Sequence, residues 1–120
     1  MILVDTSIWI DHLRASDKSL SNLLNTGRVL AHPFVVGELA LGSLRQRDII
    51  LDALSDLPQA EVATDGEVLI FIDQHALSGL GIGYVDAHLL AAVRLTAGAV
   101  LWTRDKRLHK VADRLKLAMV

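Results

Sequence analysis

Three carboxylates in this chain stand alone in apolar surroundings, and a fourth follows an apolar run. Asp5 is the only charged side chain among the first ten residues, and it directly follows the apolar run Ile2-Leu3-Val4. Glu38 is the only formal charge between residues 29 and 44, and Asp86 is the only one between residues 74 and 93. Asp105 lies just past another apolar run, Val100-Leu101-Trp102. Burying a carboxylate is costly unless it is paired or binds a metal, so these four are candidate functional residues.

The chemistry that these residues could perform is that of a divalent metal site. Carboxylates at close range cannot all ionise without a compensating cation. The chain has no cysteine, and its five histidines show no pair at ligand spacing, which leaves oxygen ligands that suit Mg²⁺ or Mn²⁺. Such a site binds phosphate oxygens and can activate water for in-line attack. Structural explanations also exist, because Asp86 could complement a helix dipole and Glu38 could pair with an arginine.

The elements that must position these acids alternate between strands and helices. Short apolar runs predict strands, and residues at helical spacing with capping signals predict helices. The expected strands are Ile2–Val4, Val29–Ala31, an edge strand Glu61–Ala63, Val100–Trp102 and Leu117–Met119. The first expected helix follows Ser7, and the second follows Ser16 or Asp17 and is stopped by Gly27. The other expected helices span about 33–41, 43–57, 64–80, 85–96 and 106–115. This pattern predicts one layered α/β domain over residues 1–120, with a short parallel sheet of four to five strands.

In such a fold the carboxyl ends of the central strands form the ligand site. We therefore expect Asp5 and Asp105 to lie close together if their two strands are neighbours. Glu38 shares a helical face with Phe34, Val35 and Leu41, which predicts that it points toward the core. The glycine-rich stretch 79–83 lacks the spacing of a nucleotide-binding loop, so we interpret it as a structural hinge.

Composition limits the class of protein. Hydrophobic residues make up 52% of the 120 residues, which is typical of a folded domain rather than a disordered one. No apolar run approaches a membrane span and no secretory signal is visible, so we expect a soluble cytoplasmic protein. The net charge of −2 does not suggest a nucleic-acid binder, but residues 104–116 hold six basic side chains against two acids. This segment is either a phosphate-binding face or a solvated helix surface.

Four motifs together resemble PIN domains and, more narrowly, the VapC toxins of bacterial toxin–antitoxin pairs. They are Val4-Asp5-Thr6-Ser7, Gly37-Glu38-Leu39-Ala40-Leu41-Gly42, Tyr84-Val85-Asp86-Ala87-His88 with the apolar residues after it, and Thr103-Arg104-Asp105-Lys106-Arg107-Leu108. The resemblance covers nearly the whole chain, and its specificity comes from the order and separation of the four motifs.

This resemblance implies a three-layer α/β/α fold and a Mg²⁺- or Mn²⁺-dependent endoribonuclease that inhibits translation and growth. It implies Asp5, Glu38, Asp86 and Asp105 as catalytic and metal-binding residues, with Ser7 and Thr103 assisting through hydrogen bonds. The expected partners are an RNA substrate, a second copy of the chain and a small VapB-like antitoxin that blocks the site. For the RNA we expect phosphate contacts from Arg104, Lys106, Lys110 and Arg114.

Other classes fit the sequence less well. A receiver domain also has an acidic Mg²⁺ site, but it expects an acidic pair near the end of its first strand, and Asp5 has no acid beside it. A haloacid-dehalogenase phosphatase needs a second aspartate two positions after Asp5, where this chain has Ser7. A non-catalytic interaction module with a similar fold would show no metal-dependent cleavage of RNA.

The distribution of apolar residues also predicts self-association. The mean hydropathy of +0.40 is high for so small a domain, which indicates more apolar surface than one core easily covers. From Asp48 to Val93 there is no Lys or Arg. We therefore expect a two-fold dimer that uses part of the helical region 48–80.

Overall fold

A short parallel sheet lies at the centre of the computed structural model, which describes residues 1–120. Its three strands are β1 (Ile2–Val4), β2 (Val29–Leu30) and β3 (Val100–Trp102), in the order β2-β1-β3. The central strand β1 pairs Leu3 with Leu30 on one side and with Leu101 on the other. The expected α/β class with a parallel sheet is therefore confirmed, and β1 and β3 are neighbours whose carboxyl ends meet.

The predicted number of four to five strands was wrong. Beside β2, Ala31 forms a single bridge with Gln59, and the backbone N–H of Glu61 then bonds the side chain of Thr96 instead of the sheet. Beside β3, Leu101 forms a single bridge with Ala118. Of the two segments expected as further strands, Leu117–Met119 contributes only the bridge of Ala118 to Leu101. The segment Glu61–Ala63 lies just past the bridging residue Gln59.

Seven helices surround the sheet, and several begin or end where the sequence did not predict. They are α1 (Thr6–Arg14), α2 (Lys18–Asn25), α3 (Pro33–Leu41), α4 (Arg47–Ser55), α5 (Asp65–Gln74), α6 (Tyr84–Leu95) and α7 (Lys106–Arg114). None of these helices is long and apolar enough to cross a membrane.

The two largest differences from the expected helices have local causes. α4 starts at residue 47 instead of 43, because the Arg47 guanidinium donates to the carbonyl of Ala40 and folds the preceding segment back onto α3. α5 ends at Gln74 instead of near residue 80, because Ala76 adopts a left-handed conformation with φ of 52°. The N–H of Leu77 then donates to the carbonyl of Ile72, which closes a Schellman turn without the usual glycine.

Helix caps place two of the four acids. Asp5, rather than Ser7, is the N-cap of α1, and Asp105 is the N-cap of α7. A carboxylate at this position accepts from free N–H groups of the first turn and complements the helix dipole. At the start of α5, Thr64 and Glu67 form a capping box, in which each side chain accepts from the other residue's backbone N–H.

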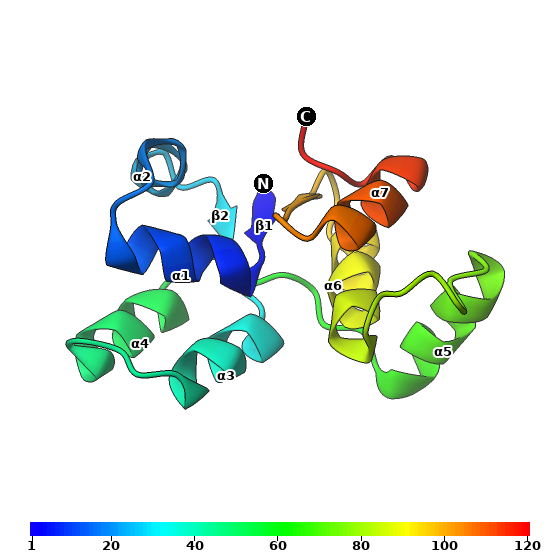
Figure 1. Ribbon diagram of the computed structural model, residues 1–120, viewed down its shortest axis with the longest axis horizontal. Helices are drawn as coiled ribbons and strands as arrows, with labels where there is room; N and C mark the ends of the chain where they lie inside the picture. The colour runs from blue at the N-terminus through cyan, green and yellow to red at the C-terminus, as the bar shows by residue number, and fades with distance from the viewer.

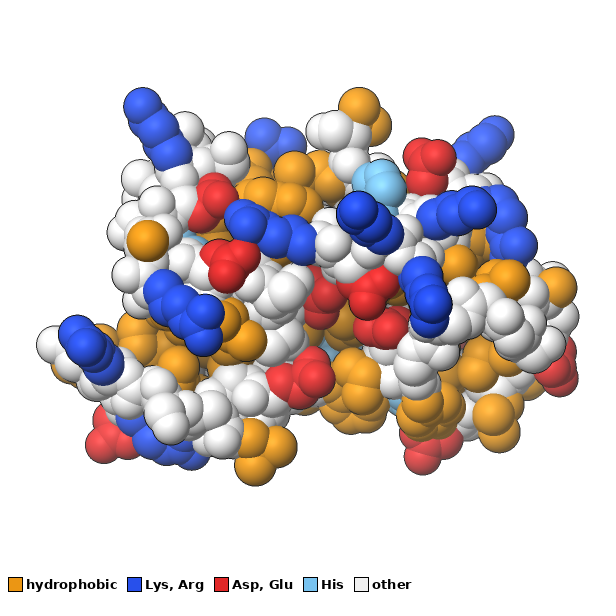
Figure 2. Space-filling model, in the orientation of Figure 1, with side chains coloured by type: hydrophobic (Ala, Val, Ile, Leu, Met, Phe, Trp, Pro, Cys, Tyr) orange, Lys and Arg blue, Asp and Glu red, His pale blue; other side chains and the backbone are white.

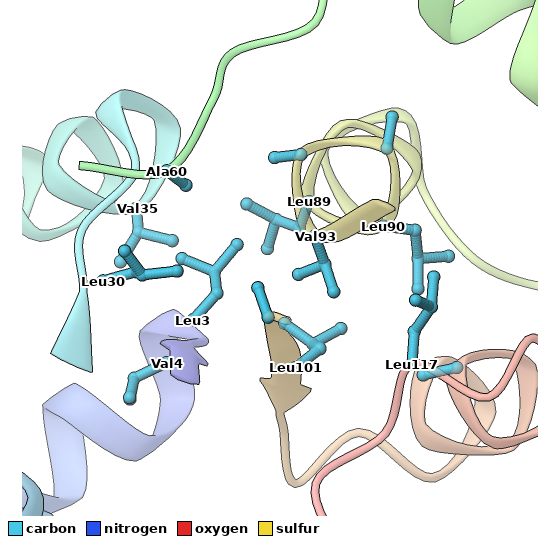
Figure 3. Close-up of a cluster of buried hydrophobic side chains, with 14 of the residues drawn as sticks. Leu3, Val4, Leu30, Val35, Ala60, Leu89, Leu90, Val93, Leu101 and Leu117 are labelled. Carbon is cyan, nitrogen blue, oxygen red and sulfur yellow. The ribbon is translucent and has the colours of Figure 1, made fainter. Parts of the chain in front are cut away.

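The core fills both faces of the sheet. Figure 3 shows Leu3 of β1 and Leu101 of β3 near Leu89 and Val93 of α6, while Val4 points away from them. All five side chains are at most 1% exposed. Helices on both sides of the sheet thus give the expected layers.

Two ring side chains, Trp9 and His32, also lie in this interior. Trp9 belongs to the core, and His32 caps α3 by accepting from the N–H of Phe34 at 3.0 Å. Burial, followed by the charge of the neighbouring His88, lowers the pKa of His32 to about 4. His32 is therefore neutral near pH 7, which agrees with a structural role.

The chain divides into two groups of helices with the sheet between them (Figure 1). Helices α1 to α4 lie on one side, and α5 to α7 lie on the other, in a molecule of about 40 × 27 × 24 Å. β1 runs directly into α1, so the carboxyl edge of the sheet faces the space between these two groups (Figure 1).

Candidate active site

Both oxygens of Asp5 are held by hydrogen bonds at the carboxyl end of β1. Oδ1 accepts from the backbone N–H of Thr6 at 2.8 Å, and Oδ2 accepts from the hydroxyl of Thr103 at 2.7 Å. The side chain is half-buried. Because one bond belongs to the helix cap and the other to β3, the orientation of this carboxylate is fixed by the sheet itself.

Thr103 connects Asp5 to Asp105 at the end of β3. The Thr103 side chain is buried, and its hydroxyl also accepts from the N–H of Asp105 at 3.1 Å. Asp105 is exposed, and its Oδ1 accepts from the N–H of Leu108 at 3.0 Å. Asp105 therefore keeps one carboxylate oxygen free of hydrogen bonds to the protein.

Glu38 comes from α3 and does not point into the core. The buried face of α3 carries Val35 and Leu39, whereas Glu38 is exposed. The prediction of a core-facing glutamate was wrong because its side of the helix borders an open cavity, where a carboxylate stays hydrated. The hydroxyl of Thr6 donates to Oε1 of Glu38 at 2.8 Å, which ties α3 to the residue next to Asp5.

Asp86 occupies the first turn of α6, as expected. Its Oδ2 accepts from the N–H of Gly83 at 2.9 Å, and the carboxylate is half-buried. Burial is the largest influence and raises the pKa of Asp86, while the Gly83 N–H acts in the opposite direction. The charges of Asp5, Asp105 and Glu38 raise this pKa further, so the four acids lie close enough to repel one another electrostatically.

One open cavity of about 750 Å³ collects these residues. All four acids line it, together with Thr6, Ser7, Gly83 and Arg104. The Ser7 hydroxyl is buried but has no hydrogen-bond partner within the chain, which leaves it free for a ligand. Figure 2 shows acidic side chains gathered near the middle of this face, with Lys and Arg side chains around them.

Comparison with known proteins agrees with this architecture. The family model described as PIN domain matches residues 2–114. The chain belongs to the PIN-domain family. It is 56% identical over 108 residues to Ribonuclease VapC32 of Mycobacterium tuberculosis, an alignment that covers 90% of this chain and 87% of that protein. The same protein in the strain H37Rv gives the same values. The chain is thus a VapC-type PIN domain, as its four motifs suggested.

The residues of this PIN domain fit a divalent cation by their chemistry. Four carboxylates line the cavity, and its one cation, Arg104, is paired with Asp11 and Asp17 outside the four. The mutual repulsion of the four acids contributes to the raised pKa of Asp86. No three of the acids converge closely enough in the structure to hold one ion by themselves. This is compatible with Mg²⁺, which commonly takes one or two carboxylates and completes its shell with water and substrate phosphate.

The basic residues predicted to contact RNA lie in different surroundings. Arg104 lines the cavity of this PIN domain, but its guanidinium pairs with Asp11 at 2.7 Å and with Asp17 at 3.2 Å. Arg114 donates to the carbonyl of His75 at 2.8 Å. Lys106 and Lys110 are exposed on α7 and make no ion pair. Lys106 and Lys110 are therefore the two basic residues most available for a ligand.

Sequence reasoning missed Thr6 and Gly83 as members of the site. Thr6 bonds Glu38 across 32 residues, and no periodic pattern can reveal such a pairing. Gly83 contributes only a backbone N–H, so its residue type carries no chemical signal. The hydroxyl beside Asp5 could have indicated Thr6, because hydroxyl groups often position carboxylates in active sites.

Proposed function

We propose that this protein is a Mg²⁺- or Mn²⁺-dependent endoribonuclease that acts as the toxin of a toxin–antitoxin pair. The observation that carries the proposal is the meeting of four carboxylates, from four separate segments, in one cavity at the carboxyl edge of the sheet. The similarity to Ribonuclease VapC32 supports RNA as the substrate. Cleavage of cellular RNA in the cytoplasm would inhibit translation and growth.

In this proposal the chain's own residues divide the work of phosphodiester hydrolysis. Asp5, held by Thr103, and Glu38, Asp86 and Asp105 would hold the cation, which supplies charge neutralisation at the phosphate and lowers the pKa of bound water. Asp86, whose pKa is already raised, is suited to accept a proton from the attacking water. The unpartnered Ser7 hydroxyl is placed to donate to a phosphate oxygen.

The basic residues of α7 would bring the RNA to this acidic cavity. A polyanion is repelled by four carboxylates, so nearby positive charge is needed for approach. We assign phosphate contacts to Lys106, Lys110 and Arg114, which are exposed on α7, and to Arg104 at the cavity wall. The single bond from Arg114 to a neutral carbonyl leaves its charge uncompensated.

We also propose a small VapB-like antitoxin and a homodimer as partners. The open acidic cavity would attract a guanidinium as well as a metal ion, so an arginine of the antitoxin could occupy it and block cleavage. A complex of the two proteins should then be inactive. An active complex that still contains metal would contradict this mode of inhibition.

The decisive experiment is cleavage of labelled RNA by the purified protein with Mg²⁺, with Mn²⁺ and with EDTA. We expect cleavage only with a divalent ion. In the matched variant Asp5→Asn we expect a loss of at least about 100-fold, because an amide is a poor ligand, while the fold is kept because asparagine also caps helices. A folded wild-type protein that binds RNA but never cuts it would indicate the non-catalytic interaction module. If the protein does cleave RNA, mapping new 5′ ends after its induction in cells would identify the RNA target.

A further inference from the structure

A second cavity adjoins the acidic one. It measures about 660 Å³ and lies between α1, α3, the segment 42–46 and the start of α4. Ile10 and Glu38 line both cavities, so the two share a wall. We call this second cavity the side groove. A chain-like substrate that is cut in the acidic cavity has to continue out of it, and the side groove is directly adjacent.

Two arginines that form no ion pair give the side groove positive charge. Arg14 and Arg45 both line it and are both exposed, and neither forms an ion pair with any acid of the chain. Arg104 on the acidic cavity is instead held by two aspartates. The only acid of the groove is Glu38 at the shared wall. In Figure 2, Lys and Arg side chains stand beside exposed apolar side chains over the region of α1 and α4.

The remaining lining of the side groove combines apolar and neutral polar groups. Leu13, Leu39 and Ile50 are among its apolar residues, and Ser43 and Gln46 add a hydroxyl and an amide. An apolar surface with a few hydrogen-bonding groups is what binds a flat heterocycle with defined edges. The Arg47 guanidinium donates to the carbonyl of Ala40, which joins the start of α4 on one side of the groove to α3.

Gln46 is the least regular residue of the groove. It is the N-cap residue of α4, but its side chain makes no capping hydrogen bond. Its φ of 51° lies in the left-handed region, which costs a residue with a side chain about 1–2 kcal/mol. Backbone strain of this kind concentrates at functional sites. The amide of Gln46 is thus held at the groove without serving the helix that it begins.

We propose that the side groove binds the nucleotide next to the scissile phosphate. Arg14 and Arg45 contact its phosphates, the apolar residues contact the base, and Gln46 reads the edge of the base. The inference rests on the proposed ribonuclease function and extends it by assigning a residue that sets sequence preference. RNA is favoured over a peptide because the groove continues the wall of the cavity where cleavage would occur and presents two free cations to a polyanion.

The charge part of the proposal is tested by salt titration of RNA binding. Binding of a fluorescein-labelled single-stranded RNA of randomised sequence is measured in the Asp5→Asn background, with Arg14→Ala, Arg45→Ala and both together. Each lost phosphate contact should lower the log–log salt slope by about 0.7, and the double variant should lower it by about 1.4. Arg14→Lys and Arg45→Lys should restore most of the slope.

The matched control for these variants is Arg28→Ala. Arg28 is also exposed and makes no ion pair, but it precedes β2 at the opposite, amino edge of the sheet. Its slope should equal that of the parent protein. If Arg14→Ala and Arg45→Ala behave as Arg28→Ala does, the inference is wrong.

The reading of the base is tested in the active protein with Gln46→Gly and Gln46→Asn. Glycine removes the amide and suits the positive φ, so the fold should be kept, while asparagine keeps an amide and tolerates the same backbone. Sequencing the products of a randomised RNA should show a changed base preference at one position beside the cut for Gln46→Gly. An unchanged preference at every position would overturn the assignment.

The outcomes separate this inference from the proposed function. Failure of the wild-type protein to cut or bind RNA with either metal ion would refute the ribonuclease proposal and the groove with it. Normal metal-dependent cleavage together with unchanged slopes and preferences would refute the groove alone. A change confined to binding of a protein partner would assign the groove to that partner and also refute the inference.

Discussion

The Thr103 hydroxyl joins the carboxylate of Asp5 to the backbone of Asp105, at the ends of two neighbouring strands. It donates to Oδ2 of Asp5 at 2.7 Å and accepts from the N–H of Asp105 at 3.1 Å. Asp5 and Asp105 are each N-caps, so the same hydroxyl also links the starts of α1 and α7. The spacing of the two acids is therefore fixed by one buried side chain.

Replacing Thr103 with valine should damage both stability and cleavage. Thr103→Val keeps the shape but leaves the Asp105 N–H without its acceptor and Asp5 without its donor, which should cost about 1–3 kcal/mol in the free energy of unfolding. Thr103→Ser keeps the hydroxyl and should cost about 1 kcal/mol for the lost methyl group. Urea unfolding measures the first effect. For cleavage, the Mg²⁺ concentration that gives half-maximal activity should rise in Thr103→Val and not in Thr103→Ser. Equal Mg²⁺ concentrations for the two variants would contradict a positioning role.

Asp86 should make stability depend on pH in a defined direction. Its raised pKa means that the folded protein binds this proton more tightly than the unfolded chain. Ionised Asp86 therefore destabilises the fold at pH values above the raised pKa, and the penalty disappears as pH falls through it toward the ordinary value of 3.8. Asp86→Asn, which can still accept from Gly83, should thus have a higher Tm than the wild type at pH 7 in EDTA.

The Tm difference between Asp86→Asn and the wild type should shrink as the pH is lowered. Thermal unfolding of both proteins across the acidic pH range measures this Tm difference. Because the other acids titrate in both proteins, their effect on Tm cancels in the difference. Added Mg²⁺ at pH 7 should raise the Tm of the wild type more than that of the variant, because the ion compensates the same repulsion. A difference that stays constant with pH would show that repulsion at Asp86 does not control stability.

The sequence allowed Asp5, Glu38 and Asp86 to be found because each is the only charge in an apolar segment, and Asp105 because it follows an apolar run. Asp5 and Asp105 also follow strands, and the rule that ligands gather at carboxyl strand ends predicted that they would lie together. Their common cavity in the structure agrees with that expectation. The direction of Glu38 was mispredicted because helical periodicity reports which side is apolar, and it does not report whether that side borders a core or an open cavity.

Other features depend on backbone geometry or on distant segments, which side-chain patterns do not encode. The short edges of the sheet depend on single pairings such as Ala31 with Gln59. The end of α5 depends on Ala76 in a left-handed conformation, where no glycine marked the turn. The side groove combines Arg14 at the end of α1 with Arg45 in the turn before α4, and the two show no common spacing.

Ala76 offers a direct test of this backbone effect. Ala76→Gly should stabilise the protein by about 0.5–1 kcal/mol, because glycine adopts a positive φ without the steric cost of a Cβ atom. The matched control is Ala53→Gly, since Ala53 is also exposed but lies inside α4. That change should destabilise by a similar amount, about 0.5–1 kcal/mol. Urea unfolding of both variants gives the two signs, and a destabilising Ala76→Gly would mean that the turn is not strained.

Self-association should depend on an exposed apolar pair on α5. Leu69 and Ile70 are each 58% exposed, and they lie within the region 48–80 that lacks Lys and Arg. A two-fold dimer buries the same patch of both subunits, so an exposed apolar pair is a candidate for such an interface. We expect the wild type to be a dimer at tens of micromolar by light scattering, and Leu69→Lys/Ile70→Lys to be a folded monomer.

Leu41→Lys is the control, because Leu41 is 91% exposed at the end of α3, outside this region, and its change should leave the dimer intact. A monomeric wild type, or a dimer that survives both lysines, would show that α5 is not the interface.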